Sequence, residues 1–219
     1  MLKALVFDFD GVIIDTESVW FCIYRDWLKR EYDYDLRIED YLVCVGSHSS
    51  ELFAFLKKDI GEHVDGYAYE QQAMEEYIRR ISELPPMKGV AELIHEARKK
   101  GLKIAAATSA TEKKPRIHLE RLGLISYFDA FSTAELSKRL KPEPDIFLKA
   151  AELLGCKPQE CLAIEDSGNG LLAARRANMP CLVVPNQITK HCDFEGYYKL
   201  VDSLDEVSLD EIMKDFDQT

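Results

Sequence analysis

Two aspartates, Asp8 and Asp10, stand one residue apart directly after an apolar run over residues 2–7, and Gly11 follows them. An apolar run of this length is typical of a buried strand. Two carboxylates at its end would be crowded and partly desolvated, and they would repel each other unless a cation or a shared proton relieved the pair. The pattern predicts a metal-dependent site for phosphoryl transfer, although a simple acidic turn would use the same residues.

The spacing of the two aspartates suits this chemistry. Alternation along an extended strand places Asp8 and Asp10 on the same side. One carboxylate could then attack phosphorus and form an aspartyl-phosphate, which divides a difficult displacement into two steps. The other could protonate the leaving oxygen and afterwards activate water.

Further polar residues follow later apolar runs. Thr108 and Ser109 come after residues 104–107, Glu165 and Asp166 come after residues 161–164, and Lys141 lies between these two segments. Each has a plain structural alternative, because a threonine can cap a helix, a lysine can be solvated and acidic residues favour a helix start. A parallel sheet, however, would bring all of them to one edge.

The elements that would position these residues can be read from the hydrophobic pattern. Four strand-length apolar runs alternate in the later part of the chain with amphipathic helical patterns; the runs cover residues 2–7, 104–107, 161–164 and 181–184. This alternation predicts an α/β fold, with a Rossmann-like, doubly wound parallel sheet as its core. Ligands of such sheets bind beyond the carboxyl ends of the strands.

A long helical stretch interrupts the alternation after the first strand. We therefore predict a core domain over residues 1–15 and 87–219, and an inserted α-helical cap domain over residues 16–86 that ends at Pro85-Pro86. Residues 16–85 contain 8 Lys or Arg and 15 Asp or Glu, a net charge of −7. We expect this acidic cap to cover the strand ends.

The composition excludes several classes of partner. The chain has 219 residues, 47% of them hydrophobic, and a net charge of −11. Such an acidic protein lacks the basic footprint of nucleic-acid binding and is a poor ligand for anionic membranes. Six cysteines without a CxxC pair, and a strand predicted almost at the first residue, favour a cytoplasmic protein with reduced thiols and no signal peptide. We expect a monomer.

The motifs together resemble the haloacid dehalogenase superfamily, in the branch with a helical cap inserted after the first motif. The likeness covers nearly the whole chain and preserves the order of the motifs. The matching segments are residues 8–17 for motif I, Thr108 for motif II, Lys141-Pro142 for motif III, and Glu165-Asp166-Ser167 with Gly170 for motif IV.

The resemblance implies a role for each catalytic position. Asp8 would be the nucleophile, and Asp10 would be the general acid and base. Thr108 would hydrogen-bond a phosphoryl oxygen, and Lys141 would neutralise charge on the nucleophile and the phosphate. An acid at position 10 serves phosphate esters, and the dehalogenases of this family lack it, so dehalogenation is not expected.

The resemblance also implies a magnesium site. Asp8, the backbone carbonyl of Asp10, and Asp166 would bind Mg²⁺ directly, and Glu165 would bind it directly or through water. Magnesium suits oxygen ligands and keeps several waters, so few carboxylates are needed. The scattered histidines and cysteines offer no spacing for zinc.

The favoured activity is hydrolysis of a small phosphate ester, with a sugar phosphate as first choice. The main alternative is a β-phosphoglucomutase-type mutase, but those enzymes have a histidine at the position of Trp20 and a cap arginine that residues 46–49 lack. Phosphonate hydrolysis would need a cap lysine, and Lys57 and Lys58 fit a solvated helix face better. A non-enzymatic phospho-switch is disfavoured by the large cap.

The cap should select the substrate, since it closes over the strand ends. The positions expected to face the substrate are Trp20, Gly46, Ser47 and His48 in the cap and Ser109 in the core. Each of these could equally serve packing or hinge motion. The negative charge of the cap disfavours substrates that carry a second strongly anionic group.

Overall fold

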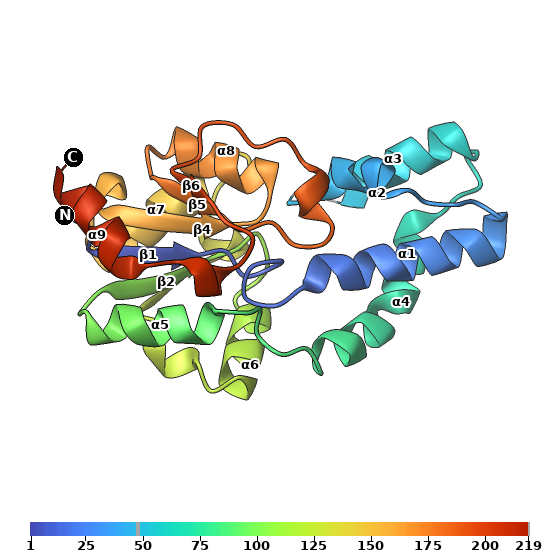
Figure 1. The fold of residues 1–219 in the computed structure, drawn as a ribbon. Coiled ribbons are helices and arrows are strands. Elements are labelled where there is room, and N and C mark those ends of the chain that lie inside the picture. Colours follow the sequence, from blue (N-terminus) through green and yellow to red (C-terminus); the bar gives the residue numbers. More distant parts are fainter. Residues whose placement is uncertain (47–48, 219) are drawn as a thin grey trace.

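The protein folds around one six-stranded sheet. The structure is a computed structural model that describes residues 1–46 and 49–218. All neighbouring strands are parallel, in the order β3-β2-β1-β4-β5-β6 (Figure 1). The strands are β1 (Ala4–Phe7), β2 (Lys103–Ala107), β3 (Ala130–Ser132), β4 (Cys161–Glu165), β5 (Cys181–Val183) and β6 (Lys199–Leu200). The predicted α/β fold with a doubly wound parallel sheet is confirmed.

Both faces of the sheet are buried, which is why its central strands are apolar throughout. In β1, Leu5 and Phe7 belong to the core on one face, and Ala4 and Val6 belong to the core on the other. The second face carries mostly small side chains, so helices can pack closely on it. These include the alanines at positions 4, 105, 107 and 163.

Helices cover the two faces of the sheet in separate layers. α5 (Val90–Lys99) and α9 (Leu209–Gln218) share the core of the first face, and α7 (Asp145–Leu154) and α8 (Gly168–Arg176) share that of the second (Figure 1). α6 (Lys113–Arg121) follows β2 and lies on the first side. None of the helices in the described part of the chain has the length and hydrophobicity that crossing a membrane requires.

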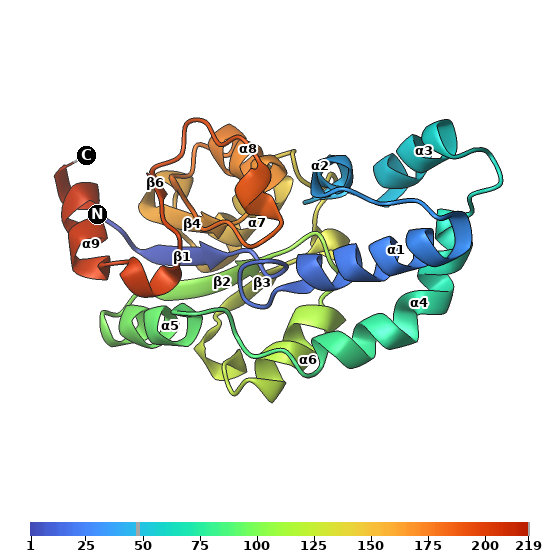
Figure 2. The ribbon, with the colours of Figure 1, turned by 45° about the vertical axis from the view of Figure 1, so that its right-hand side comes forward.

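Residues 16–86, called here the helical unit, lie beyond the carboxyl ends of the strands (Figures 1 and 2). They contain α1 (Thr16–Tyr32), α2 (Ile38–Tyr41), α3 (Ser49–Asp59) and α4 (Gly66–Ile81). Most of the unit's buried side chains form a cluster rich in aromatic rings, in which Ile188 from the rest of the chain also takes part. Trp27 of α1 stacks on Tyr69 of α4, with ring centroids 4.2 Å apart.

Short 3₁₀ helices connect these elements. Within the described residues they are η1 (Leu42–Cys44), η2 (Ile125–Tyr127), η3 (Ala134–Leu136), η4 (Pro158–Glu160), η5 (Thr189–His191) and η6 (Leu204–Glu206).

The chain crosses between the core and the helical unit twice, at neighbouring points. At the first crossing the Asp15 carboxylate accepts a hydrogen bond from the Ser18 N–H at 3.1 Å and caps α1. At the second crossing the Met87 N–H donates to the carbonyl of Ile13 at 2.8 Å. The two crossing segments are therefore hydrogen-bonded to each other.

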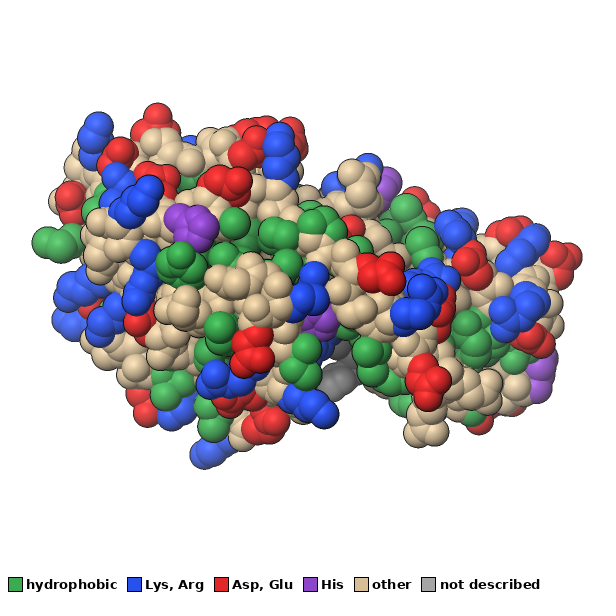
Figure 3. Space-filling view, turned by 90° about the horizontal axis from the view of Figure 1, so that it is seen from below, with side chains coloured by type: hydrophobic (Ala, Val, Ile, Leu, Met, Phe, Trp, Pro, Cys, Tyr) green, Lys and Arg blue, Asp and Glu red, His purple; other side chains and the backbone are tan. Residues whose placement is uncertain are grey.

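The helical unit also touches the core on either side of the strand ends. The Asn169 side chain of α8 donates to the carbonyl of Val45 at 3.0 Å. Across the strand ends, Lys114 Nζ of α6 lies 5.3 Å from the ring centroid of Tyr77 of α4. In Figure 3 the surface is notched where the two parts meet, and acidic and basic side chains are interspersed over both.

Two short strands were not expected from the hydrophobic pattern. β3 and β6 form the two edges of the sheet and contain three and two residues. Leu200 in β6 is 43% exposed, so an apolar run is not needed there. Edge strands of this kind carry too few buried positions to show a periodicity.

The close packing of α8 against β4 gives a direct test of the fold. A Cβ at Gly170 would lie 1.9 Å from the Glu165 carboxylate carbon, whereas a Cβ at Gly168 would meet nothing within 4 Å. We expect Gly170→Ala to cost about 1–3 kcal/mol, because the Glu165 carboxylate would have to move. We expect Gly168→Ala, in the same helix, to change stability by less than about 0.5 kcal/mol. Thermal unfolding of the two variants checks this, and equal melting temperatures would contradict it.

Candidate active site

A buried lysine joins two strand ends. Asp8 follows β1, and its side chain Oδ1 lies 2.7 Å from Lys141 Nζ. The same Nζ lies 2.6 Å from Glu165 Oε1 at the end of β4. Burial alone would lower the pKa of Lys141, but the two carboxylates raise it above its ordinary value. Lys141, only 5% exposed, is therefore a charged core residue and not a solvated one.

Three buried carboxylates surround this lysine. Asp8, Glu165 and Asp166 each place an oxygen within 4.8 Å of the others. Burial raises the pKa of Asp8 to about 8 despite the attraction of Lys141. Burial, together with the charges of Glu165 and Asp8, also raises the pKa of Asp166 well above its ordinary range. One ammonium does not compensate three carboxylates, so this all-oxygen group fits a divalent cation.

The backbone makes room for these acids. A Cβ at Gly11, whose φ is +80°, would lie 2.2 Å from Asp166 Oδ2. The same Oδ2 accepts a hydrogen bond from Asn186 Nδ2 at 2.7 Å. Glu165 Oε2 accepts from the N–H groups of Asp166 and Ser167 at 3.1 and 3.3 Å. The orientation of both acids is thus fixed by their neighbours.

Asp10 has different surroundings from Asp8. Its Oδ1 accepts hydrogen bonds from Lys114 Nζ at 2.5 Å and from Thr16 Oγ1 at 2.7 Å. Burial would raise the pKa of Asp10, but the charge and hydrogen bond of Lys114 outweigh it and lower the pKa below its ordinary value. The two aspartates therefore differ in the direction of their pKa shifts, the condition under which neighbouring carboxyls take different chemical roles.

The hydroxyls after β2 complete the core side. Thr108 Oγ1 accepts from the Ala110 N–H at 3.0 Å and lies 3.5 Å from Asp10 Oδ2, the outer limit of a hydrogen bond. Ser109 Oγ is buried and has no hydrogen-bond partner among the described residues. A ligand oxygen at this point would satisfy it.

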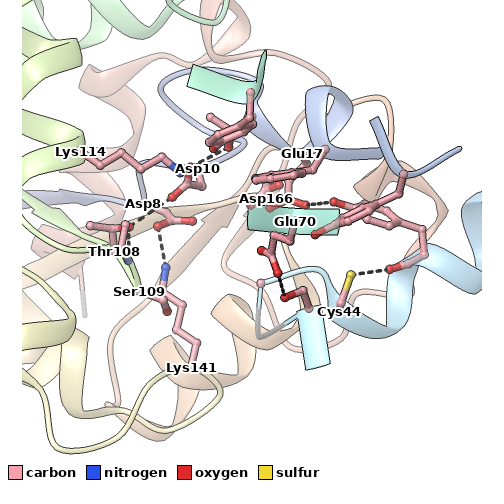
Figure 4. Close-up of a pocket in the computed structure, with 18 residues that line it drawn as sticks. Asp8, Asp10, Glu17, Cys44, Glu70, Thr108, Ser109, Lys114, Lys141 and Asp166 are labelled. Carbon is pink, nitrogen blue, oxygen red and sulfur yellow. Dashed lines mark hydrogen bonds and ion pairs between the residues drawn. The ribbon is translucent and has the colours of Figure 1, made fainter. Parts of the chain in front are cut away.

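These groups open into one cavity of about 260 Å³ between the strand ends and the helical unit (Figure 4). The core contributes Asp8, Asp10, Thr108, Ser109, Ala110, Lys114, Lys141 and Asp166 to its lining. The helical unit contributes Thr16, Glu17, Trp20, Tyr24, Tyr41, Cys44, Gly46, Ser49, Glu70 and Tyr77.

The positions predicted to face the substrate divide into two groups. Trp20, Gly46 and Ser109 line the cavity. Trp20 is stacked between Tyr24 and Tyr77, with ring centroids 5.2 and 4.2 Å away. The other two predicted positions, Ser47 and His48, lie outside the described residues.

Several residues of the site were not predicted. Lys114 stands in the first turn of α6, where a cation opposes the helix dipole, and that unfavourable placement was a readable signal. Asn186 follows the end of β5, so the strand-end argument already used for Thr108 could have found it. Glu17 was predicted only as the last residue of motif I, yet it lines the cavity, and burial beside Asp10 raises its pKa to about 7. Glu70 of α4 gave no sequence signal.

Comparison with known proteins agrees with this geometry. Residues 5–184 match the family model of haloacid dehalogenase-like hydrolases. The protein YhcW of Bacillus subtilis is 35% identical over 210 residues, with 95% of each chain covered. A "Phosphorylated carbohydrates phosphatase" of Thermotoga maritima is 31% identical, covering 81% of this chain and 82% of its own. The crystal structure of β-phosphoglucomutase from Clostridium difficile superposes with a TM-score of 0.78, at 26% identity and coverages of 100% and 98%.

The structure has a parallel sheet with clustered acids and one buried lysine at the ends of its strands. Together with these matches, this arrangement identifies a hydrolytic enzyme. The chain belongs to the haloacid dehalogenase-like hydrolase family. The family expected from the motifs is confirmed, and the expectation of a phosphatase agrees with it.

The buried acids predict an unusual dependence of stability on pH. Asp8, Glu17 and Asp166 have raised pKa values in the folded protein, so the folded state binds more protons than the unfolded state. The free energy of unfolding of the metal-free protein should then fall as pH rises from about 5 to about 8. Burial lowers the pKa of His118, which acts in the opposite direction, but it is one group against three.

Thermal unfolding in a chelator checks this expectation. We expect the melting temperature to fall by roughly 5 °C across this pH range, and Glu17→Gln to reduce the fall. Glu75→Gln, at an exposed position of α4, serves as the control. Excess MgCl₂ should stabilise the protein more at the upper pH, where the acids can ionise. A melting temperature in chelator that rises with pH would contradict the assignment.

Proposed function

We propose that this enzyme is a magnesium-dependent phosphatase that hydrolyses a small phosphorylated metabolite, with a sugar phosphate as the preferred class, through an aspartyl-phosphate intermediate. The observation that carries the proposal is the contrast between Asp8, buried among acids and bound by Lys141, and Asp10, held ionised by Lys114. The family match and a relative named as a phosphatase of phosphorylated carbohydrates support it.

Asp8 is the nucleophile in this proposal. A carboxylate oxygen of Asp8 forms the bond to phosphorus while the bond from phosphorus to the leaving oxygen breaks. Lys141 holds Oδ1 in place and offsets the negative charge of the attacking and transferred groups. Thr108 and Ser109 lie on the same side of the cavity and can donate to phosphoryl oxygens.

The magnesium ion would be held by Asp8, Glu165, Asp166 and the backbone carbonyl of Asp10. When bound, it supplies the positive charge that keeps the buried acids ionised and neutralises the phosphate. The raised pKa values of Asp8 and Asp166 support such a cation, because both carboxyls would otherwise keep a proton near neutral pH.

Asp10 acts as the general acid and base. The arriving phosphate brings negative charge beside Asp10 and raises its pKa. This favours the protonated form of Asp10, which donates its proton to the leaving alkoxide. After the alcohol has left, the ionised form that Lys114 stabilises removes a proton from water, and that water cleaves the aspartyl-phosphate. One carboxyl thus serves both steps.

Residues 16–86 act as the cap in this proposal. They supply the aromatic and acidic lining of the cavity and, when closed on the core, exclude water from the phosphoryl group. The structural likeness to β-phosphoglucomutase keeps a phosphosugar mutase as the second candidate. The two activities differ in product, since only the phosphatase releases free phosphate.

The nucleophile is tested by Asp8→Asn. We expect this variant to release no phosphate from a panel of sugar phosphates or from p-nitrophenyl phosphate, because an amide does not attack phosphorus. It should remain folded, since Asn can still accept a hydrogen bond from Lys141. Asp35→Asn, at an exposed aspartate, is the control and should keep full activity. Substantial phosphate release by Asp8→Asn would refute the nucleophile, and activity in a metal-free chelated sample would refute the magnesium role.

The role of Asp10 is tested separately by Asp10→Asn. With sugar phosphates we expect turnover to fall by about 10²-fold or more, from the loss of proton transfer. Nitrophenolate leaves without protonation. With p-nitrophenyl phosphate the variant should therefore release about one equivalent of nitrophenolate per enzyme in a rapid burst, followed by slow release of phosphate. Equal losses for both substrates, without a burst, would assign Asp10 a merely structural role.

A further inference from the structure

The cavity has two chemically different ends. The core end carries Asp8 and Lys141 and receives the phosphoryl group under the proposed function. The helical unit supplies the facing wall, which carries Glu17 of α1, beside Asp10, and Glu70 of α4 (Figure 4). These two acids take no part in the proposed chemistry, so they are free to act on the rest of the substrate.

Each of these carboxylates is bound by a hydroxyl. Glu17 Oε2 accepts from the Tyr41 hydroxyl at 3.1 Å, and Glu70 Oε2 accepts from Ser49 Oγ at 2.9 Å. Within residues 1–46 and 49–218, neither acid has a lysine, arginine or histidine at ion-pair distance. A carboxylate has about four acceptor sites, so both retain capacity for further donors.

The cations of the described lining are already engaged at the core end. Lys141 is shared by Asp8 and Glu165, and Lys114 is bound to Asp10. Among the described lining residues none offers a free positive charge to the leaving group. The wall that faces the leaving group therefore consists of acidic and aromatic side chains and offers hydrogen-bond acceptors.

We propose that Glu17 and Glu70 make the cap side of the cavity a selectivity filter that accepts leaving groups bearing neutral hydroxyls and rejects those bearing a second phosphate. This inference rests on the proposed function. Sugar hydroxyls donate to the unused oxygens of the two acids. Above about pH 7, where Glu17 ionises, a second phosphate would place two negative charges beside both carboxylates in a partly desolvated space.

The filter also bears on the type of reaction. A mutase that transfers a phosphoryl group from Asp8 to a sugar monophosphate must hold a sugar bisphosphate in this cavity. Repulsion by Glu17 and Glu70 destabilises that complex, whereas hydrolysis of the phosphoenzyme needs only water in the cavity. The same two acids thus favour hydrolysis of the phosphoenzyme over phosphoryl transfer to a sugar monophosphate.

Competition against p-nitrophenyl phosphate hydrolysis tests the filter. The inhibition constants of glucose 6-phosphate and fructose 6-phosphate are compared with those of glucose 1,6-bisphosphate and fructose 1,6-bisphosphate, with excess MgCl₂. We expect each monophosphate to bind about 10-fold or more tightly than its bisphosphate, and the ratio to shrink as salt screens the charges. In Glu70→Gln and in the double variant with Glu17→Gln the ratio should fall several-fold, because the amide keeps the size and loses the charge.

Glu75→Gln, on the exposed face of the same helix, is the matched control and should keep the wild-type ratio. Equal inhibition by monophosphates and bisphosphates in the wild type would overturn the filter and leave the phosphatase proposal standing. A ratio that is unchanged in the double variant would also overturn it. A protein that releases no phosphate from p-nitrophenyl phosphate or from any sugar phosphate would instead overturn the proposed function.

Discussion

The site depends on one ammonium group that is almost completely buried. Lys141 Nζ lies between Asp8, which follows β1, and Glu165, the last residue of the adjacent strand β4. Removing either partner would leave a charge buried without compensation, which is among the most costly defects in a protein interior. The register of β1 against β4, the loop that carries Lys141 and the room that Gly170 leaves beside Glu165 all serve to keep this contact.

This arrangement also separates two aspartates that are nearly adjacent in the sequence. Asp8 points into the group of buried acids, and its pKa is raised, while Asp10 meets Lys114 and its pKa is lowered. The difference does not come from the residues themselves, which are chemically identical. It comes from the elements around them, since Lys141 follows β3 and Lys114 belongs to the helix after β2. The topology of the sheet is therefore what gives the two carboxyls opposite pKa shifts.

The sequence was informative wherever burial or strand ends determine the residue type. The strands β1, β2, β4 and β5 are buried on both faces and appear in the sequence as apolar runs, and the site residues at the ends of β1, β2 and β4 could be named in advance. The edge strands lack this pattern. Lys114, Glu17 and Glu70 were missed for another reason: their place in the cavity depends on how helices pack across it, and periodicity within one helix carries no information about the helix opposite.

The hydrogen bond between Met87 and Ile13 has a mechanical consequence. Two independent flexible connections would allow the helical unit to tilt, twist and slide. Two connections that are hydrogen-bonded to each other restrict these movements, because neither segment can shift without the other. Under the proposed function, a cap held in this way would return to the same place after each opening, so that its acidic wall would meet the strand ends in the same register.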